Sequence, residues 1–301
     1  MIKRTLSFSH PAYLSLRNKQ LVVRLERHEG ECEQEVTIPI EDIGFVVLDH
    51  RQITITHGAL SALLDNNVSV VTCNESHMPV GLMLPLEGNT IQSERFQEQL
   101  AASLPLRKQL WQQTVQQKIL NQAALLRELH HIETSNMVQW SKDVHSGDTT
   151  NLEGRAAAFY WSQLFPTIPH FTRSRDGDYP NALLNYGYAI LRAVIARALV
   201  GSGMLPTLGI HHHNRYNAYC LADDIMEPYR PFVDRLVVNT MAECCDVEVT
   251  TAIKRRLLTV PTLEVRIGGQ RSPLMVAASQ TSASLARCFA GEGRRITYPE
   301  L

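Results

Sequence analysis

Several features that would assign this chain to a specialised class of protein are absent. Its 29 basic and 30 acidic residues give a formal net charge of −1, so no overall positive field marks a polyanion-binding protein. Nucleic-acid binding would therefore need a local basic patch or a metal ion that reverses the sign of a carboxylate cluster. The six cysteines form no CxxC pair and no regular framework, which is typical of free thiols in a reducing cytosol.

Targeting and nucleotide-binding signals are also missing. The N-terminal residues 1–9 start with basic side chains but lack the apolar stretch of a signal peptide. The most apolar internal run, residues 186–200, is interrupted by Arg192 and Arg197 and is too short to span a bilayer. The sequence contains no GxxxxGK[ST] loop and no GxSxG elbow. We therefore expect a soluble, cytoplasmic protein with no membrane partner and without a covalent serine intermediate.

The first 85 residues have the pattern of a small β-rich domain. A length of 301 residues favours two domains at about 150 residues each. One helix is expected at residues 57–64, closed by an Asp-Asn-Asn turn. Short runs rich in β-branched residues, separated by turn formers, predict strands at residues 21–25, 36–40, 44–48, 53–55 and 68–71.

The rest of the chain, residues 86–301, has a helical pattern, because Gln, Leu and Ala replace Val, Ile and Thr and apolar residues recur every three or four positions. The predicted fold class is α+β, with a β-rich N-terminal domain at 1–85 and a larger all-helical C-terminal domain at 86–301. Helices are expected at 91–129, 151–164, 181–200, 221–226, 231–241, 251–258 and 279–290.

The densest polar cluster lies at residues 209–231. Three histidines lead into a segment with three carboxylates, and two of these acids, Asp224 and Glu227, stand three residues apart and share a helical face. Imidazole nitrogen with carboxylate oxygen suits Mn²⁺ and tolerates Mg²⁺. The alternative is a polar loop beside a solvated helix, but neighbouring carboxylates repel one another without a cation. The cluster consists of His211, His212, His213, Asp223, Asp224 and Glu227.

Other segments add candidate residues. Glu153 begins an otherwise apolar helix, although the helix dipole alone favours an acid there. Arg173 and Arg175 precede an aromatic, amide-rich helix start that could bind phosphate, or they could be solvated loop residues. Lys254, in a Lys-Arg-Arg run, is either an ordinary surface charge or a contact to DNA.

Four ordered blocks resemble one known family. They are Leu-Glu-Gly-x-Ala-Ala around Glu153, Asn-Ala-Leu-Leu-Asn-Tyr-Gly-Tyr from Asn181, Gly-Ile-His-His from Gly209, and Leu-Ala-Asp-Asp-Ile-Met-Glu-Pro-Tyr-Arg-Pro from Leu221. The order and wording are similar to the CRISPR-associated adaptation endonuclease, the universal spacer integrase, and most similar to its type II branch. The resemblance covers nearly the whole chain.

The resemblance implies a set of site residues. The catalytic metal, Mg²⁺ or Mn²⁺, would be held by Glu153, His212 and Glu227, with Asp224 as an auxiliary ligand or a support of one. The adjoining His211 and His213 leave the choice of histidine open. By their charge, four basic residues are the candidate contacts to DNA phosphates: Arg173, Arg175, Arg230 and Lys254.

The resemblance also implies an activity and partners. A homodimer joined through the N-terminal domains would assemble with a small ferredoxin-like CRISPR-associated partner and carry a short double-stranded DNA fragment to the CRISPR array. A 3′ hydroxyl of the fragment would then attack a repeat phosphodiester. Two other functions remain open at this stage: a metal-dependent nuclease or branched-DNA resolvase of repair, and a catalytically silent DNA-binding scaffold whose acidic cluster holds structural Ca²⁺.

Overall fold

The computed structural model describes residues 3–25, 34–174, 177, 179–243 and 250–301. The chain divides into two compact units, Met1–Gly88 and Asn89–Leu301, called the β unit and the helical unit below. The elements follow in the order β1(Arg4–Phe8), β2(Ala12–Arg17), β3(Gln20–Leu25), β4(Gln34–Pro39), η1(Ile40–Asp42), β5(Ile43–Leu48), β6(Ile53–Ile55), α1(His57–Asp65), β7(Ser69–Cys73), β8(Pro79–Met83), α2(Gln92–Ala101), α3(Leu104–His130), α4(Ser135–Asp143), α5(Leu152–Leu164), α6(Asn181–Gly201), α7(Cys220–Met226), η2(Glu227–Tyr229), α8(Arg230–Glu243), α9(Thr251–Leu257), η3(Val260–Thr262), β9(Glu264–Ile267), β10(Gln270–Pro273) and α10(Leu274–Phe289).

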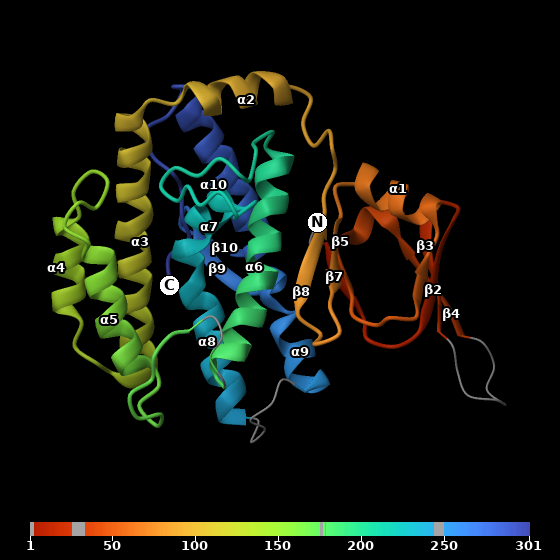
Figure 1. The fold of residues 1–301 in the computed structure, drawn as a ribbon, viewed down its shortest axis with the longest axis horizontal. Helices are drawn as coiled ribbons and strands as arrows, with labels where there is room; N and C mark the ends of the chain where they lie inside the picture. The colour runs from red at the N-terminus through yellow and green to blue at the C-terminus, as the bar shows by residue number, and fades with distance from the viewer. Residues whose placement is uncertain (1–2, 26–33, 175–176, 178, 244–249) are drawn as a thin grey trace. The chain divides into compact units, whose positions relative to one another are not determined.

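In its described residues, the β unit contains two four-stranded sheets, the helix α1 and the short 3-10 helix η1 (Figure 1). One sheet has the order β1-β5-β7-β8, in which the first three strands are parallel and β8 is antiparallel to β7. The other has the order β4-β3-β2-β6, in which β2, β3 and β4 are antiparallel neighbours and β6 is parallel to β2. The five predicted strands and the predicted helix are confirmed, while β1, β2 and β8 are additional.

Both sheets contribute to one apolar core. Leu14 and Leu21 come from one sheet and Val46 from the other, and Leu63 of α1 joins them; all four are fully buried. The helix begins where the Thr56 side chain accepts a hydrogen bond from the Ala59 amide, a typical N-cap. Burial of branched aliphatic side chains therefore holds this unit together.

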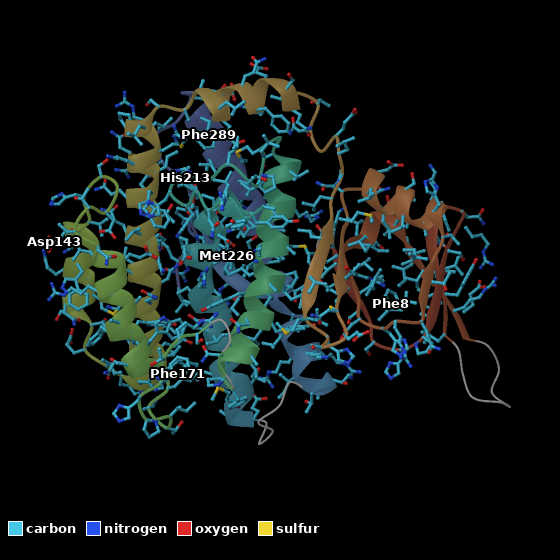
Figure 2. All side chains as sticks on the ribbon, viewed as in Figure 1. Phe8, Asp143, Phe171, His213, Met226 and Phe289 are labelled. Carbon is cyan, nitrogen blue, oxygen red and sulfur yellow. The ribbon has the colours of Figure 1, made fainter. Side chains whose placement is uncertain are left out.

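The helical unit is organised around α6, which packs against α7, α8 and α10 (Figure 1). A Cβ atom at Gly187 would lie 2.5 Å from Val233 Cγ1, so glycine allows α6 and α8 to approach closely. The apolar run at residues 186–200 lies within α6. The expectation that it is too short for a bilayer was wrong, because α6 has 21 residues and is long and apolar enough to cross a membrane. However, 78% of its most apolar window is buried in the protein, as in a core helix. Side chains fill the space between the helices of this unit, and the buried Met226 is one of them (Figure 2).

The long helix expected at 91–129 is two helices, α2 and α3. Ser103 separates them, because its hydroxyl accepts the Leu106 amide and caps α3, and Pro105 lies in the first turn, where its missing N–H costs nothing. The second of these helices, α3, packs against α4, α5, α8 and η2. It therefore runs alongside the elements that carry most of the candidate site.

One helix and one hairpin of the helical unit were not expected. Helix α4 was missed, and the strands β9 and β10 form an antiparallel hairpin in a domain expected to be all-helical. The hairpin turn contains Gly268 and Gly269, both with positive φ angles of 56° and 77°. Alternating Val265 and Ile267 before this Gly-Gly pair is a hairpin signal that the sequence does contain. The overall α+β class, β-rich first and mainly helical second, is confirmed.

Candidate active site

The histidine loop is fixed by one buried carboxylate. Asp224, which is fully buried in α7, accepts hydrogen bonds from the backbone amides of His211 at 2.9 Å and His212 at 3.3 Å. A Cβ atom at Gly209 would lie 2.3 Å from the carbonyl oxygen of His212 and 2.9 Å from Asp224 Oδ2. Only glycine fits this approach, which explains the Gly-Ile-His-His block. Asp224 therefore supports the loop that presents the histidines.

The three histidines have different surroundings. His211 stacks on Trp111 of α3 with the ring centroids 4.1 Å apart, and burial lowers its pKa. His212 Nδ1 lies 2.5 Å from Asp224 Oδ1, and this hydrogen bond raises the pKa of His212. His213 instead lines a pocket of about 290 Å³ with Arg107, and its side chain is labelled in Figure 2. Since a carboxylate fixes Nδ1 of His212, that residue keeps Nε2 as a donor atom, the usual arrangement behind a metal-binding histidine.

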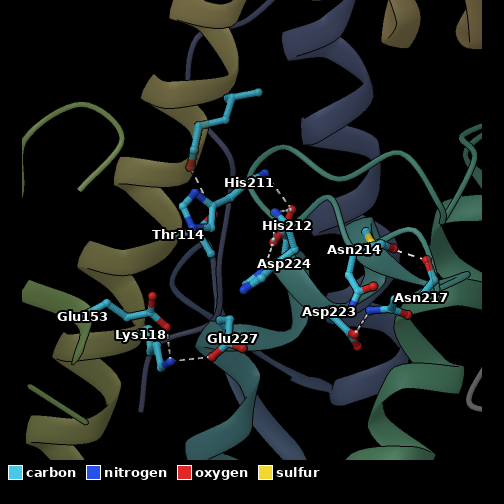
Figure 3. A network of polar contacts seen from close by, with 12 residues as sticks. Thr114, Lys118, Glu153, His211, His212, Asn214, Asn217, Asp223, Asp224 and Glu227 are labelled. Carbon is cyan, nitrogen blue, oxygen red and sulfur yellow. Dashed lines mark hydrogen bonds and ion pairs between the residues drawn. The ribbon is translucent and has the colours of Figure 1, made fainter. Parts of the chain in front are cut away.

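Two predicted acids converge on a lysine that the sequence analysis did not consider (Figure 3). Lys118 Nζ lies 2.6 Å from Glu153 Oε1 and 2.6 Å from Glu227 Oε2, so residues of α3, α5 and η2 meet at one point. The side chains of Lys118 and Glu227 are only 10% and 7% exposed. Burial would lower the pKa of Lys118, but the two carboxylates outweigh it and raise the pKa. Burial likewise would raise the pKa of Glu227, but Arg230 and Lys118 lower it.

Arg230 joins the acid pair to a second buried network. Its guanidinium lies 3.0 Å from Glu227 Oε1 and 4.6 Å from the ring centroid of Tyr188. The hydroxyl groups of Tyr188 and Tyr160 donate to Asp234 at 2.5 and 2.7 Å. Burial raises the pKa of Asp234 to about 6, although these hydrogen bonds and the nearby arginines act in the opposite direction. The arginine is thus held on both sides, by an ion pair and by an aromatic ring.

The other predicted DNA-binding residues are less closely grouped. Arg173 donates to the side-chain oxygens of Asn181 at 3.0 Å and Asn185 at 2.6 Å, and its guanidinium lies 5.2 Å from the Tyr188 ring, so it belongs to the Arg230 network. Lys254 lies in the last turn of α9. Arg175 lies outside the described residues.

Each carboxylate of the acidic cluster has its own partner within the chain. Asp223 accepts two hydrogen bonds from Arg192, at 2.6 and 3.1 Å, and one from Asn217 at 2.7 Å. Asp224 is paired with His212, and Glu227 with Lys118 and Arg230. The argument that these acids need a metal to relieve their repulsion was therefore wrong, because cationic and amide groups already compensate them. Asp223 serves to connect the loop to α6.

A further polar residue of α3 aligns the helix with η2. The amide nitrogen of Asn121 donates to the Pro228 carbonyl at 2.7 Å and to the Pro299 carbonyl at 2.9 Å, while its oxygen accepts the Leu301 amide at 3.2 Å. The bond to Pro228 lies next to Glu227 in sequence. Asn121 thus fixes the distance between the backbone that carries Lys118 and the backbone that carries Glu227.

The chemistry of the donors fits a divalent metal, although the ligands do not surround a common point. Glu153, Glu227 and the free Nε2 of His212 are the donor types that Mn²⁺ and Mg²⁺ accept. Glu227 Oε2 is buried, and Lys118 Nζ lies 2.6 Å from it as an ion pair. Within the described residues, no three His, Cys, Asp or Glu side chains form a group that could hold an ion. The ammonium group of Lys118 lies between the two glutamates.

The residues missed from the sequence share one property: each is a polar side chain on the buried face of a helix. Lys118 and Asn121 follow Thr114 at helical spacing, and all three are buried in α3. Asp234 is buried in α8 behind Phe232 and Val233. A charged residue at a core position of an apolar helix pattern is the signal that could have identified Lys118 and Asp234.

Comparison with known proteins agrees with the blocks found in the sequence. A family model described as "CRISPR associated protein Cas1" matches residues 6–244. A protein named "CRISPR-associated endonuclease Cas1" from Neisseria meningitidis serogroup C (strain 8013) is 37% identical over 304 residues, which cover 100% of this chain and 97% of the relative.

Solved structures have the same fold at lower identity. A casposase bound to integration product matches with a TM-score of 0.79 and 19% identity, over 98% of this chain and 92% of the other. A chain of a Cas6-RT-Cas1–Cas2 complex matches with a TM-score of 0.75 and 20% identity, over 99% of this chain and 36% of that longer one. The matched family model and the full-length relative confirm the resemblance: the chain belongs to the Cas1 family of CRISPR-associated proteins.

Proposed function

We propose that this protein is a metal-dependent DNA endonuclease and integrase of CRISPR adaptive immunity, which inserts short foreign DNA fragments into the CRISPR array as new spacers. The meeting of Glu153 and Glu227 at one point of a Cas1-family chain is the observation that carries the proposal, and Asp224 together with both glutamates raises the pKa of the nearby His212. The full-length relative named as an endonuclease and the casposase solved with its integration product support it.

In the proposed reaction, a 3′ hydroxyl of the donor fragment attacks a phosphorus atom at the edge of a repeat. The new phosphodiester forms as the old P–O bond breaks, the attacking hydroxyl loses its proton, and the departing oxygen gains one. No ATP is needed, because one phosphodiester replaces another. With water as the nucleophile, the same site would cut DNA. A bound metal would polarise the scissile phosphate and stabilise charge on its oxygens.

The residues of this chain would divide the work. Glu153, Glu227 and Nε2 of His212 would hold the metal, while Asp224 fixes the orientation of the imidazole. Arg230 is preorganised by Glu227 and Tyr188, so it would meet a DNA phosphate with little loss of side-chain entropy. The nitrogen and oxygen donor set suits Mn²⁺ or Mg²⁺.

The partners follow from the family. Double-stranded DNA, from both the foreign fragment and the repeat, would be the substrate, with Arg173, Arg175, Arg230 and Lys254 as phosphate contacts. The solved complex that contains Cas1 and Cas2 supports assembly with a second CRISPR-associated protein. We further propose that this partner is small and ferredoxin-like, and that the chain forms a homodimer through its β units in the cytoplasm.

The test is strand transfer of a labelled short duplex into a supercoiled plasmid that carries a CRISPR repeat, with Mn²⁺ or Mg²⁺ and the small partner. Glu227→Ala should abolish joining, and Glu292→Ala, the same change at an exposed glutamate, should leave it intact. Circular dichroism would establish that both variants are folded. Cutting without joining would instead favour a repair nuclease or resolvase, and DNA binding without either reaction would favour a scaffold.

A further inference from the structure

Lys118 lies where the proposed function requires a metal. It comes from the middle of α3 and is buried, and its ammonium group is within 2.6 Å of one oxygen from each glutamate. It hydrogen-bonds Glu153 and forms an ion pair with the otherwise unbonded Oε2 of Glu227.

We propose that Lys118 is a built-in cation that competes with the divalent metal for Glu153 and Glu227. Without metal, the ammonium group holds α3, α5 and η2 together at the site. When a metal binds, the ammonium group leaves its position between the two carboxylates. The inference rests on the proposed function, because it assumes that these two glutamates are metal ligands.

Charge balance supports the competition. Glu153 and Glu227 contribute two negative charges, and Lys118 and Arg230 contribute two positive charges within 3.0 Å of their oxygens. The site is therefore close to neutral as it stands. Adding a divalent ion without moving Lys118 would place a net excess of positive charge in a buried region, where charges are poorly screened. Displacement of the lysine restores the balance.

Geometry supports the same conclusion. Metal–oxygen distances for Mg²⁺ and similar ions are about 2.0–2.2 Å, shorter than the ammonium contacts seen here. A metal held by Glu153 and Glu227 would take the two carboxylates that Lys118 Nζ now contacts. The flexible four-carbon stem of lysine allows the ammonium group to leave, which the rigid guanidinium of Arg230, held over Tyr188, does less readily.

The neighbouring residues limit what else Lys118 could do. Asn121 already fixes α3 to the backbone at Pro228, so alignment of the two elements does not depend on Lys118 alone. If the ion pair is purely structural, removal of the lysine should weaken metal binding or leave it unchanged. If the lysine competes with the metal, its removal should strengthen metal binding, because the metal no longer has to displace the ammonium group.

The experiment is a calorimetric titration of Mn²⁺ into the metal-free full-length protein, comparing wild type with Lys118→Gln and Lys118→Met. We expect both variants to bind Mn²⁺ more tightly than wild type, by a factor of about ten or more. Without metal, each variant should have a lower melting temperature than wild type. Adding Mn²⁺ should raise the melting temperature of each variant by more than it raises that of wild type. Lys142→Gln, the same change at an exposed lysine of α4, should match wild type in both readouts.

Glu227→Ala separates failure of this inference from failure of the proposed metal site. If Mn²⁺ binding depends on Glu227 but is unchanged or weaker in the Lys118 variants, the competition is refuted and the metal site stands. If binding is insensitive to Glu227→Ala, the metal site itself is refuted, and the competition with it. If a Lys118 variant is unfolded without metal, refolding at Mn²⁺ concentrations below the wild-type Kd supports competition, and failure to refold contradicts it.

Discussion

The two units of this chain bury different kinds of side chain. Among the described residues, the β unit buries one charged side chain, Asp49, which lies 2.9 Å from His77, and its other buried side chains are apolar except for Ser69. The helical unit buries several charged side chains, each with a partner: Lys118, Asp148, Asp223, Asp224, Glu227 and Asp234.

The difference indicates that the helical unit buries charge for its chemistry, whereas the core of the β unit serves stability. Buried charges are costly, and a well-packed apolar core of equal volume is often more stable. A fold that keeps six of them in one unit therefore has a use for them that packing does not supply. In this chain Asp224 holds the histidine loop and Glu227 contacts Lys118 (Figure 3). Glu227 also pairs with Arg230, which lies over the ring of Tyr188, and the Tyr188 hydroxyl donates to Asp234.

The largest expected effect separates neighbouring histidines within the helical unit. His212→Ala should reduce strand transfer about a thousandfold or more, because it removes a proposed metal ligand together with the Asp224 contact. His213→Ala should change the rate less than about fivefold, since His213 lines a separate pocket. The rates are measured with saturating metal and the small partner. Equal losses in the two variants would contradict the assignment of roles.

The sequence blocks Gly-Ile-His-His and Ile-Met-Glu-Pro identify His212 and Glu227 as candidate site residues. Few residue types fit in these blocks, because the backbone approaches closely at Gly209 and Glu227 is buried. Lys118 is harder to identify, because the glutamines before it make its core position in the helical pattern less evident. The packing of α3 against α5 and η2 shows that its side chain points inward.

The same distinction explains the fold. Strands with β-branched runs, such as β5, were predicted, whereas β1, β2 and β8 were missed because serine, glycine or leucine interrupts the β-branched pattern there. Their pairing with distant strands, such as β1 with β5, supplies the preference that their own sequence lacks.

The second effect tests the apolar unit. Leu63→Ala in α1 should lower the free energy of unfolding of the β unit by about 3 to 5 kcal/mol, because it leaves a cavity in a fully buried cluster. Urea denaturation followed by circular dichroism measures it. The metal affinity of the native protein should be unchanged, because Leu63 lies in the unit without site residues. A parallel loss of metal binding would show that the two units are not energetically separate.

The third effect tests a buried charge by its pH dependence. The pKa of Asp234 is about 6 in the folded state and 3.8 in the reference state, so the folded protein binds more protons between these values. The free energy of unfolding should therefore fall as pH rises from 4 to 7, by about 2 kcal/mol from this residue. Asp234→Asn should remove that part of the slope while keeping the tyrosine contacts. Urea denaturation at pH 4 and 7 compares the two proteins, and parallel slopes would contradict the shift.

The smallest effect tests whether charge matters once it is exposed. Arg271 and Glu264 form an ion pair at 3.1 Å across the β9–β10 hairpin, but their side chains are 73% and 66% exposed. Arg271→Ala should change the free energy of unfolding by less than about 1 kcal/mol, because water screens the pair and the long side chains regain entropy when it breaks. Thermal denaturation at low and high salt measures it. A larger effect would mean that exposed pairs in the helical unit behave like its buried ones, and the contrast with the β unit would then depend on total charge and not on burial.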